Sequence, residues 1–192
     1  KPGPYRYEVL RAIGLSPNEA DFQPIGAEFV SQYFANANDT CFVDYGLNTA
    51  GTAYSYKIRF YTGSSPNPLG TTNPASSVFL NVAPTDRANN LSWQETVPWE
   101  NYEYVVFIKN AQGQFDTLAI VSTSSYTHTG LTNGAEYCYK ILSIGSYGIA
   151  GIVSPIYNNS QEKCAVPYDD VPPCATTLTV TNICDENVTC AE

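Results

Sequence analysis

Cysteine is the residue type with the clearest capacity for chemistry in this chain. The six cysteines are Cys41, Cys138, Cys164, Cys174, Cys184 and Cys190. A zinc site or a thiol nucleophile would need a Cys-x-x-Cys pair or a nearby histidine, and the only histidine, His128, stands in a turn-like stretch. An even number of cysteines in a tyrosine-rich, lysine-poor protein instead predicts structural disulfides and an oxidising compartment.

Carboxylates are the second group that could do chemistry. Asp86, Asp169 and Asp170 fall in stretches that we interpret as inter-domain joints, where they could bind calcium. Calcium takes about six to eight oxygen ligands, so a solvated linker is the simpler interpretation. A glycosidase needs two carboxylates in one cleft, and no pattern here brings such a pair together. Motifs for nucleophilic, phosphate or zinc-hydrolase chemistry are absent, so we predict a non-catalytic protein without a cofactor.

Composition and charge limit the possible partners. The 192-residue chain has 15 tyrosines, 13 prolines, 13 glycines and a net charge of −9. Nucleic acid and anionic membrane surfaces both attract clustered Lys and Arg, so neither is an expected partner. No apolar run approaches the length of a membrane span or a signal peptide. Methionine is absent, and we therefore expect a piece of a longer protein.

The elements that position these residues are strands, and they repeat. An alternating strand at residues 5–11 returns at 102–109, and residues 51–58 match 134–141 at Gly, both Tyr, Lys and Ile. The first strand recurs 97 residues later, whereas the second recurs only 83 residues later. The first copy therefore has 14 more residues between its two strands than the second copy, and we place them within residues 16–39. That stretch includes a weak helix candidate at residues 27–37. The repeat unit is a domain of the β class.

Each copy contains a Leu, Gly and Tyr pattern at a turn before a strand. In the second copy the residues are Leu131, Gly134 and Tyr137, and in the first copy they are Leu47, Gly51 and Tyr54. This spacing predicts a tyrosine corner, in which the ring is buried and the hydroxyl bonds to the backbone a few residues upstream. Trp93 ends an earlier strand of the second copy, and we expect it to plug the core beneath the corner.

Together these features resemble tandem fibronectin type III domains, and the resemblance covers nearly the whole chain. It implies an all-β fold of immunoglobulin-like sandwiches, truncated at both ends. The first domain would span residues 1–83 and lack its first two strands. The second, at residues 84–166, would be complete, and residues 167–192 would be a linker and the first strand of a further domain.

Shorter motifs resemble a narrower group. Residues 97–102, 130–134, 159–165 and 172–175 resemble the domains upstream of the type B sorting domain in gliding motility-associated surface proteins of Bacteroidota. These proteins are exported by the type IX secretion system, which implies a location at the cell surface or outside the cell. Asp116-Thr117-Leu118 resembles the O-glycosylation motif of the same bacteria, so Thr117 is a candidate glycan acceptor.

The repeat also predicts how two cysteines pair. If the last strands of the second copy form a hairpin near Ala150-Gly151, Cys138 and Cys164 come within a residue of facing each other. The first copy has Ser55 in place of Cys138 and no cysteine in its last strand, so both partners are absent together. Cys184 and Cys190 could close a small loop or pair with Cys174, and Cys41 has no obvious partner.

We interpret the chain as a non-catalytic spacer or adhesin stalk whose partners are neighbouring domains and the secretion machinery. Two alternatives remain open. Exposed aromatic residues such as Trp99, Tyr147 and Tyr157 could bind glycans or a protein surface if they cluster on one face. The domains could also be accessories of a secreted enzyme. A further hypothesis is that a strand at residues 176–180 completes the shortened first domain by strand addition.

Overall fold

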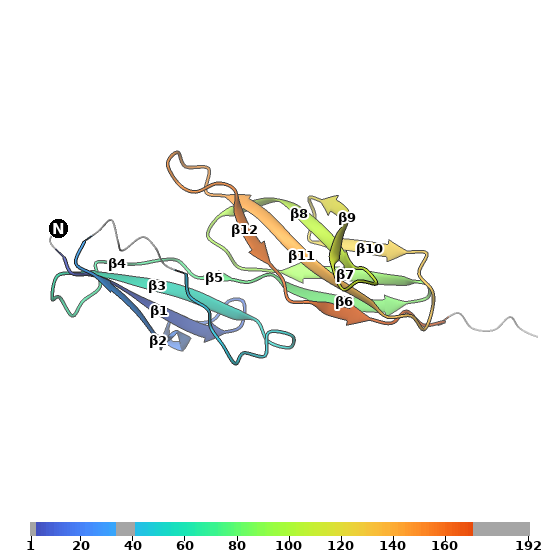
Figure 1. Cartoon of the computed structure of the whole chain (residues 1–192), viewed down its shortest axis with the longest axis horizontal. Coiled ribbons are helices and arrows are strands. Elements are labelled where there is room, and N and C mark those ends of the chain that lie inside the picture. Colours follow the sequence, from blue (N-terminus) through green and yellow to red (C-terminus); the bar gives the residue numbers. More distant parts are fainter. Residues whose placement is uncertain (1–2, 34–40, 171–192) are drawn as a thin grey trace, which may run out of the picture.

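The protein consists of two β-rich units that lie end to end (Figure 1). The computed structural model describes residues 3–33 and 41–170. The N-terminal unit contains a single antiparallel sheet, and the second unit contains two sheets packed face to face. The all-β fold class predicted from the composition is therefore correct. Among the described residues no helix is long and apolar enough to cross a membrane.

The N-terminal sheet has five strands in the order β2-β1-β3-β4, with β5 paired to the other end of β3. Its strands are β1 (Tyr5–Ile13), β2 (Gln23–Ser31), β3 (Tyr54–Thr62), β4 (Gly70–Thr71) and β5 (Ala75–Ser76). One turn of 3-10 helix, η1 (Glu19–Asp21), lies between β1 and β2. Tyrosine and β-branched residues dominate β1 and β3, as expected for strands.

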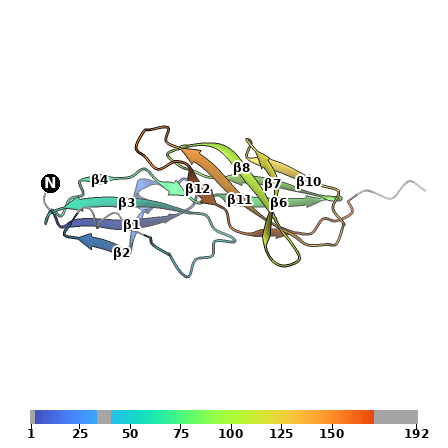
Figure 2. The same cartoon turned by 45° about the horizontal axis from the view of Figure 1, so that its top comes forward.

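The second unit is a sandwich of a three-stranded sheet and a five-stranded sheet (Figure 2). The first sheet has the order β10-β7-β6 and contains β6 (Phe79–Thr85), β7 (Ala88–Gln94) and β10 (Ser125–Thr129). The second has the order β12-β11-β8-β9, with β13 paired to β11. It contains β8 (Glu100–Lys109), β9 (Phe115–Val121), β11 (Tyr137–Ser146), β12 (Ile156–Asn159) and β13 (Lys163–Ala165). This strand order is that of a fibronectin type III-like sandwich.

The core of the sandwich follows the period-two pattern of its strands. Alternate residues of β6, β7, β8 and β11 point inward and are almost completely buried: Val78, Leu80, Val82, Leu91, Trp93, Val106, Tyr139 and Ile141. Trp93 is 3% exposed and packs edge-on against Tyr104, so it fills part of the core. Its indole N–H has no hydrogen-bond partner within the described residues, so the contribution of Trp93 is apolar burial.

The boundary between the units differs from the predicted one at residues 83/84. Strand β6 pairs with β7 along its whole length, from Phe79 opposite Gln94 to Thr85 opposite Ala88, and so belongs to the second unit. Only Ser77 and Val78 separate β5 from β6. The sequence placed this strand in both units because its alternation is equally suited to closing one sandwich or opening the next.

The N-terminal sheet has the same strand order and register as the five-stranded sheet of the second unit. Tyr7 lies opposite Phe60 in the first unit, and at the same offsets Tyr104 lies opposite Ser143 in the second. No counterpart of the β10-β7-β6 sheet exists among residues 3–33 and 41–76. The described part of the N-terminal unit is therefore one layer of a two-layer sandwich.

Residues 19–22, which belong to the extra stretch of the first copy, cover one face of the N-terminal sheet. Leu10, Ala12 and Phe22 form a small buried cluster there. The ammonium of Lys57 lies 4.9 Å from the centre of the Phe22 ring and donates a hydrogen bond to Glu19 in η1. The helix expected at residues 27–37 is wrong where it can be checked, because residues 27–31 are part of β2.

The face of the N-terminal sheet that corresponds to the core face of the second unit is contacted by Asp44. Arg11 forms an ion pair with Asp44 at 2.8 Å, and the Tyr56 hydroxyl donates to the same carboxylate at 3.0 Å. Burial and the neighbouring Asp44 carboxylate raise the pKa of Tyr56 to about 12. Ile58 remains 41% exposed, whereas its counterpart Ile141 is completely buried.

Candidate functional site

The joint between the two units is held by hydrogen bonds from Ser76. The buried Ser76 pairs with Ser55 in the N-terminal sheet. On its other side, its N–H donates to the Thr96 carbonyl at 2.8 Å and its Oγ accepts from the Thr96 N–H at 2.9 Å. The Thr96 hydroxyl also lies 3.0 Å from the hydroxyl of Ser16 in the N-terminal unit. The connection between the units is therefore a bonded joint.

Glu95 is the centre of a polar network beside this joint. Its Oε1 accepts a hydrogen bond from Asn101 at 2.7 Å, and its Oε2 accepts from Ser143 at 3.0 Å and Asn158 at 2.8 Å. The Asn158 amide also donates to the Ser76 carbonyl at 2.9 Å. One carboxylate therefore connects the end of β7 to β8, β11 and β12, and through Asn158 to the joint.

Burial governs the protonation of Glu95. Loss of solvation raises the pKa of its carboxyl, although the donors Ser143, Asn158 and Tyr104 stabilise the charged form and act in the opposite direction. Glu95 also lines a cleft of about 380 Å³ between the units, together with Leu15 and Ser16 of the first and Trp93 and Tyr104 of the second. Among the described residues that line this cleft, Glu95 is the one carboxylate, whereas a glycosidase uses two.

Two of the three aromatic residues proposed to bind a ligand lie together. The rings of Trp99 and Tyr147 meet edge to face with their centres 5.9 Å apart, and both line a cleft of about 730 Å³ that also includes Tyr102. Tyr157 lies on β12 and does not line this cleft. Tyr102 was missed in the sequence because its position in an alternating strand suggested only a structural role.

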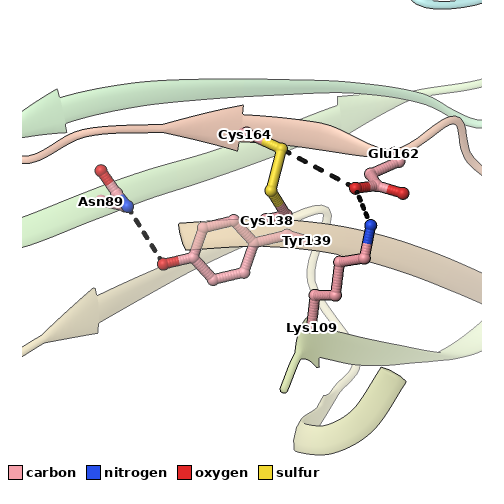
Figure 3. The surroundings of a disulfide bond; sticks show 6 residues. All are labelled: Asn89, Lys109, Cys138, Tyr139, Glu162 and Cys164. Atoms are coloured by element: carbon pink, nitrogen blue, oxygen red, sulfur yellow. Dashed lines mark hydrogen bonds and ion pairs between the residues drawn. A yellow bond between two sulfur atoms is a disulfide. The ribbon is translucent and has the colours of Figure 1, made fainter. Parts of the chain in front are cut away.

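Cys138 and Cys164 form a disulfide across neighbouring strands (Figure 3). They are direct register partners on β11 and β13, with Cα atoms 3.9 Å apart, as predicted from the hairpin argument. Beside them, Lys109 on β8 forms a 2.9 Å ion pair with Glu162. Both of these side chains are partly solvated, so the pair contributes about 1 kcal/mol or less.

Tyr137 has the geometry of a tyrosine corner. Its hydroxyl accepts a hydrogen bond from the Thr132 N–H at 3.1 Å, five residues upstream. Leu131 is buried, and Gly134 has φ of 83°, a conformation that strongly favours glycine. In the first copy, Tyr54 follows Leu47 and Gly51 at the corresponding turn, but its hydroxyl has no hydrogen bond within the described residues. Its ring instead lies 5.7 Å from the Arg11 guanidinium.

His128 belongs to a buried hydrogen-bonded chain. The Tyr139 hydroxyl accepts from the Asn89 amide at 3.0 Å and lies 3.0 Å from His128 Nδ1. Desolvation lowers the pKa of His128, which favours its neutral imidazole. Among the described residues, the hydrogen bonds of His128 and Tyr139 join them to Asn89 and to no serine or cysteine, so the geometry fits a structural role for His128.

The three candidate calcium ligands lie at the far end of the second unit. Asp86 accepts a hydrogen bond from Asn133 at 2.7 Å, and Asp170 accepts one from Thr85 at 2.9 Å. Asp86 is therefore in the β6–β7 turn, away from the joint in which it was placed. Among the described residues, the one group with metal-ligand spacing is Glu136, Cys138 and Cys164, whose two sulfurs are already bonded to each other.

Of the remaining residues singled out in the sequence, Thr117 and Cys41 are exposed to solvent, and the others lie outside the described part of the chain. Thr117 is exposed on β9, an edge strand of its sheet, and Asp116 before it accepts a hydrogen bond from Asn110. Cys41 is an exposed free thiol in the described part of the chain. Cys174, Cys184, Cys190 and the strand predicted at residues 176–180 lie outside the described residues.

No protein-family model matches the sequence, and no curated protein matches it. The chain is similar to the solved FN1–FN3 domains of chicken CNTN1, with 12% identity and a TM-score of 0.37. That match covers 87% of this chain and 55% of the other, so this chain spans about half its length. It is also similar to the chicken interferon gamma receptor alpha chain, with 13% identity, a TM-score of 0.34 and 86% coverage of each chain. The description of the second unit as fibronectin type III-like rests on its own strand order and corner.

Proposed function

We propose that this chain is a rigid structural spacer in a bacterial surface protein. The observation that carries the proposal is the position of Ser76, which pairs in register with Ser55 on β3 and hydrogen bonds to Thr96 of the second unit. Its N–H donates to the Thr96 carbonyl, and its hydroxyl accepts from the Thr96 N–H. A flexible linker would leave these backbone groups to water, whereas here they couple the two sheets.

The course of the chain suits a spacer. Strand β1 lies in the unit at one end of the molecule, and β6 runs to the opposite end (Figure 2). Thr85, the last residue of β6, bonds to Asp170. Val78, directly after the joint, is completely buried in the second core. Any bending at the joint would therefore cost hydrogen bonds and apolar burial together.

The location outside the cell is part of the same proposal. The Cys138–Cys164 disulfide is typical of an oxidising compartment. The motifs at residues 97–102, 130–134 and 159–165 support a Bacteroidota protein exported by the type IX system. The exposed Thr117 on an edge strand is sterically suited to carry the glycan of that group.

Amide hydrogen exchange tests the rigidity of the joint. We expect the Ser76 and Thr96 amides to exchange slowly in the unmodified chain, because each N–H is bonded across the joint. Ser76→Ala should speed exchange at Thr96 by removing its acceptor. Ser77→Ala is the matched control, since Ser77 is exposed and should change nothing. If both amides in the unmodified chain exchange as fast as in an unstructured peptide, the joint is a hinge and the spacer proposal fails.

Expression in a Bacteroidota host tests the location. The chain, fused upstream of a type B sorting domain, should be degraded by protease added to intact cells. In a strain that lacks type IX secretion it should be protected, and its intact mass should reveal whether Thr117 carries a glycan. Equal protection in both strains would contradict export by this route.

A further inference from the structure

The aromatic cleft is the surface feature that the spacer function leaves unused. Its lining residues come from the β7–β8 and β11–β12 connections and the adjoining ends of β8 and β11. These two connections lie at the end of the second unit nearer the N-terminal unit (Figure 1). Three aromatic side chains line it, Trp99, Tyr102 and Tyr147, in a volume of about 730 Å³. Clefts of about 300–1,000 Å³ are typical of small-molecule sites.

Trp99 is held in place before any ligand arrives. Its indole N–H donates to Asn101 Oδ1 at 2.9 Å, and Asn101 in turn donates to Glu95 at 2.7 Å. Glycine at position 145 allows this close fit, because a Cβ there would lie 2.6 Å from Trp99 Cδ1 and 2.5 Å from the Glu100 carbonyl oxygen. The Glu95 network therefore also orients the tryptophan, and a preorganised aromatic ring loses little entropy on binding.

The other two rings are presented to solvent. Tyr102 is 55% exposed and Tyr147 is 40% exposed, although Tyr147 packs against Trp99. The polar groups beside them are the exposed Glu100 carboxylate and the Ser146 hydroxyl, and none of the described residues that line the cleft is cationic. The site therefore combines aromatic surface with hydrogen-bond acceptors, and its carboxylate disfavours anionic ligands.

We propose that this cleft binds a neutral hexopyranose chain, an activity beyond that of a spacer. A pyranose ring presents C–H groups on its faces, which pack on the electron-rich faces of aromatic rings. Its hydroxyls are donors that suit the Glu100 carboxylate. Uronic or sulfated sugars would meet Glu100 and the net charge of −9, both unfavourable. A proline-rich peptide would present carbonyl acceptors to a carboxylate, so the sugar fits the polar groups better.

Isothermal titration of the full chain tests the proposal. The probes are three neutral hexasaccharides, cellohexaose, maltohexaose and mannohexaose, with hexagalacturonate as the anionic probe and a proline-rich decapeptide as the competing class. We expect saturable binding of at least one neutral hexasaccharide. Neither hexagalacturonate nor the peptide should bind.

Variants then assign the binding to the cleft. Tyr102→Ala and Tyr147→Ala should each weaken binding at least tenfold, and neither should unfold the protein because both side chains are substantially exposed. Tyr157→Ala is the matched control, since it removes a tyrosine that is 60% exposed outside the cleft. No binding of any neutral hexasaccharide, preferential binding of the peptide or the anionic sugar, or equal weakening by Tyr157→Ala would each overturn the proposal. The joint exchange experiment is unaffected by these outcomes.

Discussion

Ser55 lies directly opposite Ser76 across β3 and β5, at the register position that a disulfide occupies in the second unit. The corresponding pair there is Cys138 opposite Cys164. The serines have other roles: Ser55 donates to the Gly14 carbonyl at 2.7 Å, and Ser76 accepts from Thr96. The same sheet position therefore carries a covalent cross-link in one unit and joint-forming hydrogen bonds in the other.

Replacing both serines with cysteine should form a second disulfide. The register predicts that Ser55→Cys combined with Ser76→Cys places the two thiols within bonding reach, as in the second unit. Peptide mapping after mild oxidation should find the 55–76 cross-link. In the control, Ser55→Cys with Ser77→Cys, the second thiol is on the neighbouring exposed residue and should stay reduced. A 55–77 bond of equal yield would show that the register at the joint is not as described.

Removing the native disulfide should destabilise the second unit. Cys138→Ser with Cys164→Ser introduces the serine pair that the first unit uses at the same position. The bond closes a loop with a sequence separation of 26 residues, so its loss should lower the free energy of unfolding by about 2–4 kcal/mol. Urea unfolding followed by the fluorescence of Trp93 and Trp99 would measure the change. An unchanged midpoint would mean that the bond adds nothing to stability.

Tyr137→Phe should cost about 0.5–1.5 kcal/mol of unfolding free energy, because the Thr132 N–H loses its acceptor. Tyr54→Phe is the matched control. Its hydroxyl has no hydrogen bond in the described part of the chain, so its removal should leave stability unchanged. Chemical denaturation of the two variants side by side provides the comparison. Equal losses would indicate that the ring environment, and not the corner hydrogen bond, determines the effect.

Protonation of His128 should make stability depend on pH below about 6.5, the pKa of an unperturbed histidine. Burial lowers the pKa of His128 in the folded state, so the unfolded chain binds the proton first as the pH falls. The contribution is complete above about pH 6.5 and is lost progressively as the pH falls toward the lower folded pKa. Urea unfolding between pH 7.5 and 5 would measure the loss.

The matching control is His128→Gln, which cannot titrate and should lack this loss. The comparison is needed because Glu95 acts in the opposite sense. Its raised folded pKa stabilises the protein below about pH 4.5, and that contribution is lost as the pH rises through the folded pKa. If the histidine and glutamine forms show the same pH profile, His128 does not titrate differently in the folded and unfolded states.

The strands, the corner at Tyr137 and the disulfide could be predicted from the sequence because each depends on residues that are close in the chain or in the repeat. Alternation in β1, β3, β8 and β11 reflects one buried face of a sheet, which the period of two encodes directly. The corner at Tyr137 and the disulfide partner of Cys138 followed from turn residues and from the internal repeat. By contrast, residues 27–31 contain apolar residues at a spacing that also suits a helix, and only pairing with β1 decides for strand.

Residue patterns predicted a repeated β-protein with a tyrosine corner, a buried Trp93 and a cross-strand cysteine pair, because each of these depends on a few residues or on one strand pairing. Tertiary packing was needed to show that β6 belongs to the second unit, that Ser76 pairs with β3 and hydrogen bonds to Thr96, and that Glu95 connects four strands to an aromatic cleft. These features bring together residues far apart in the chain, such as Ser76 and Asn158. Their proximity depends on how whole sheets dock, and no local period records that arrangement.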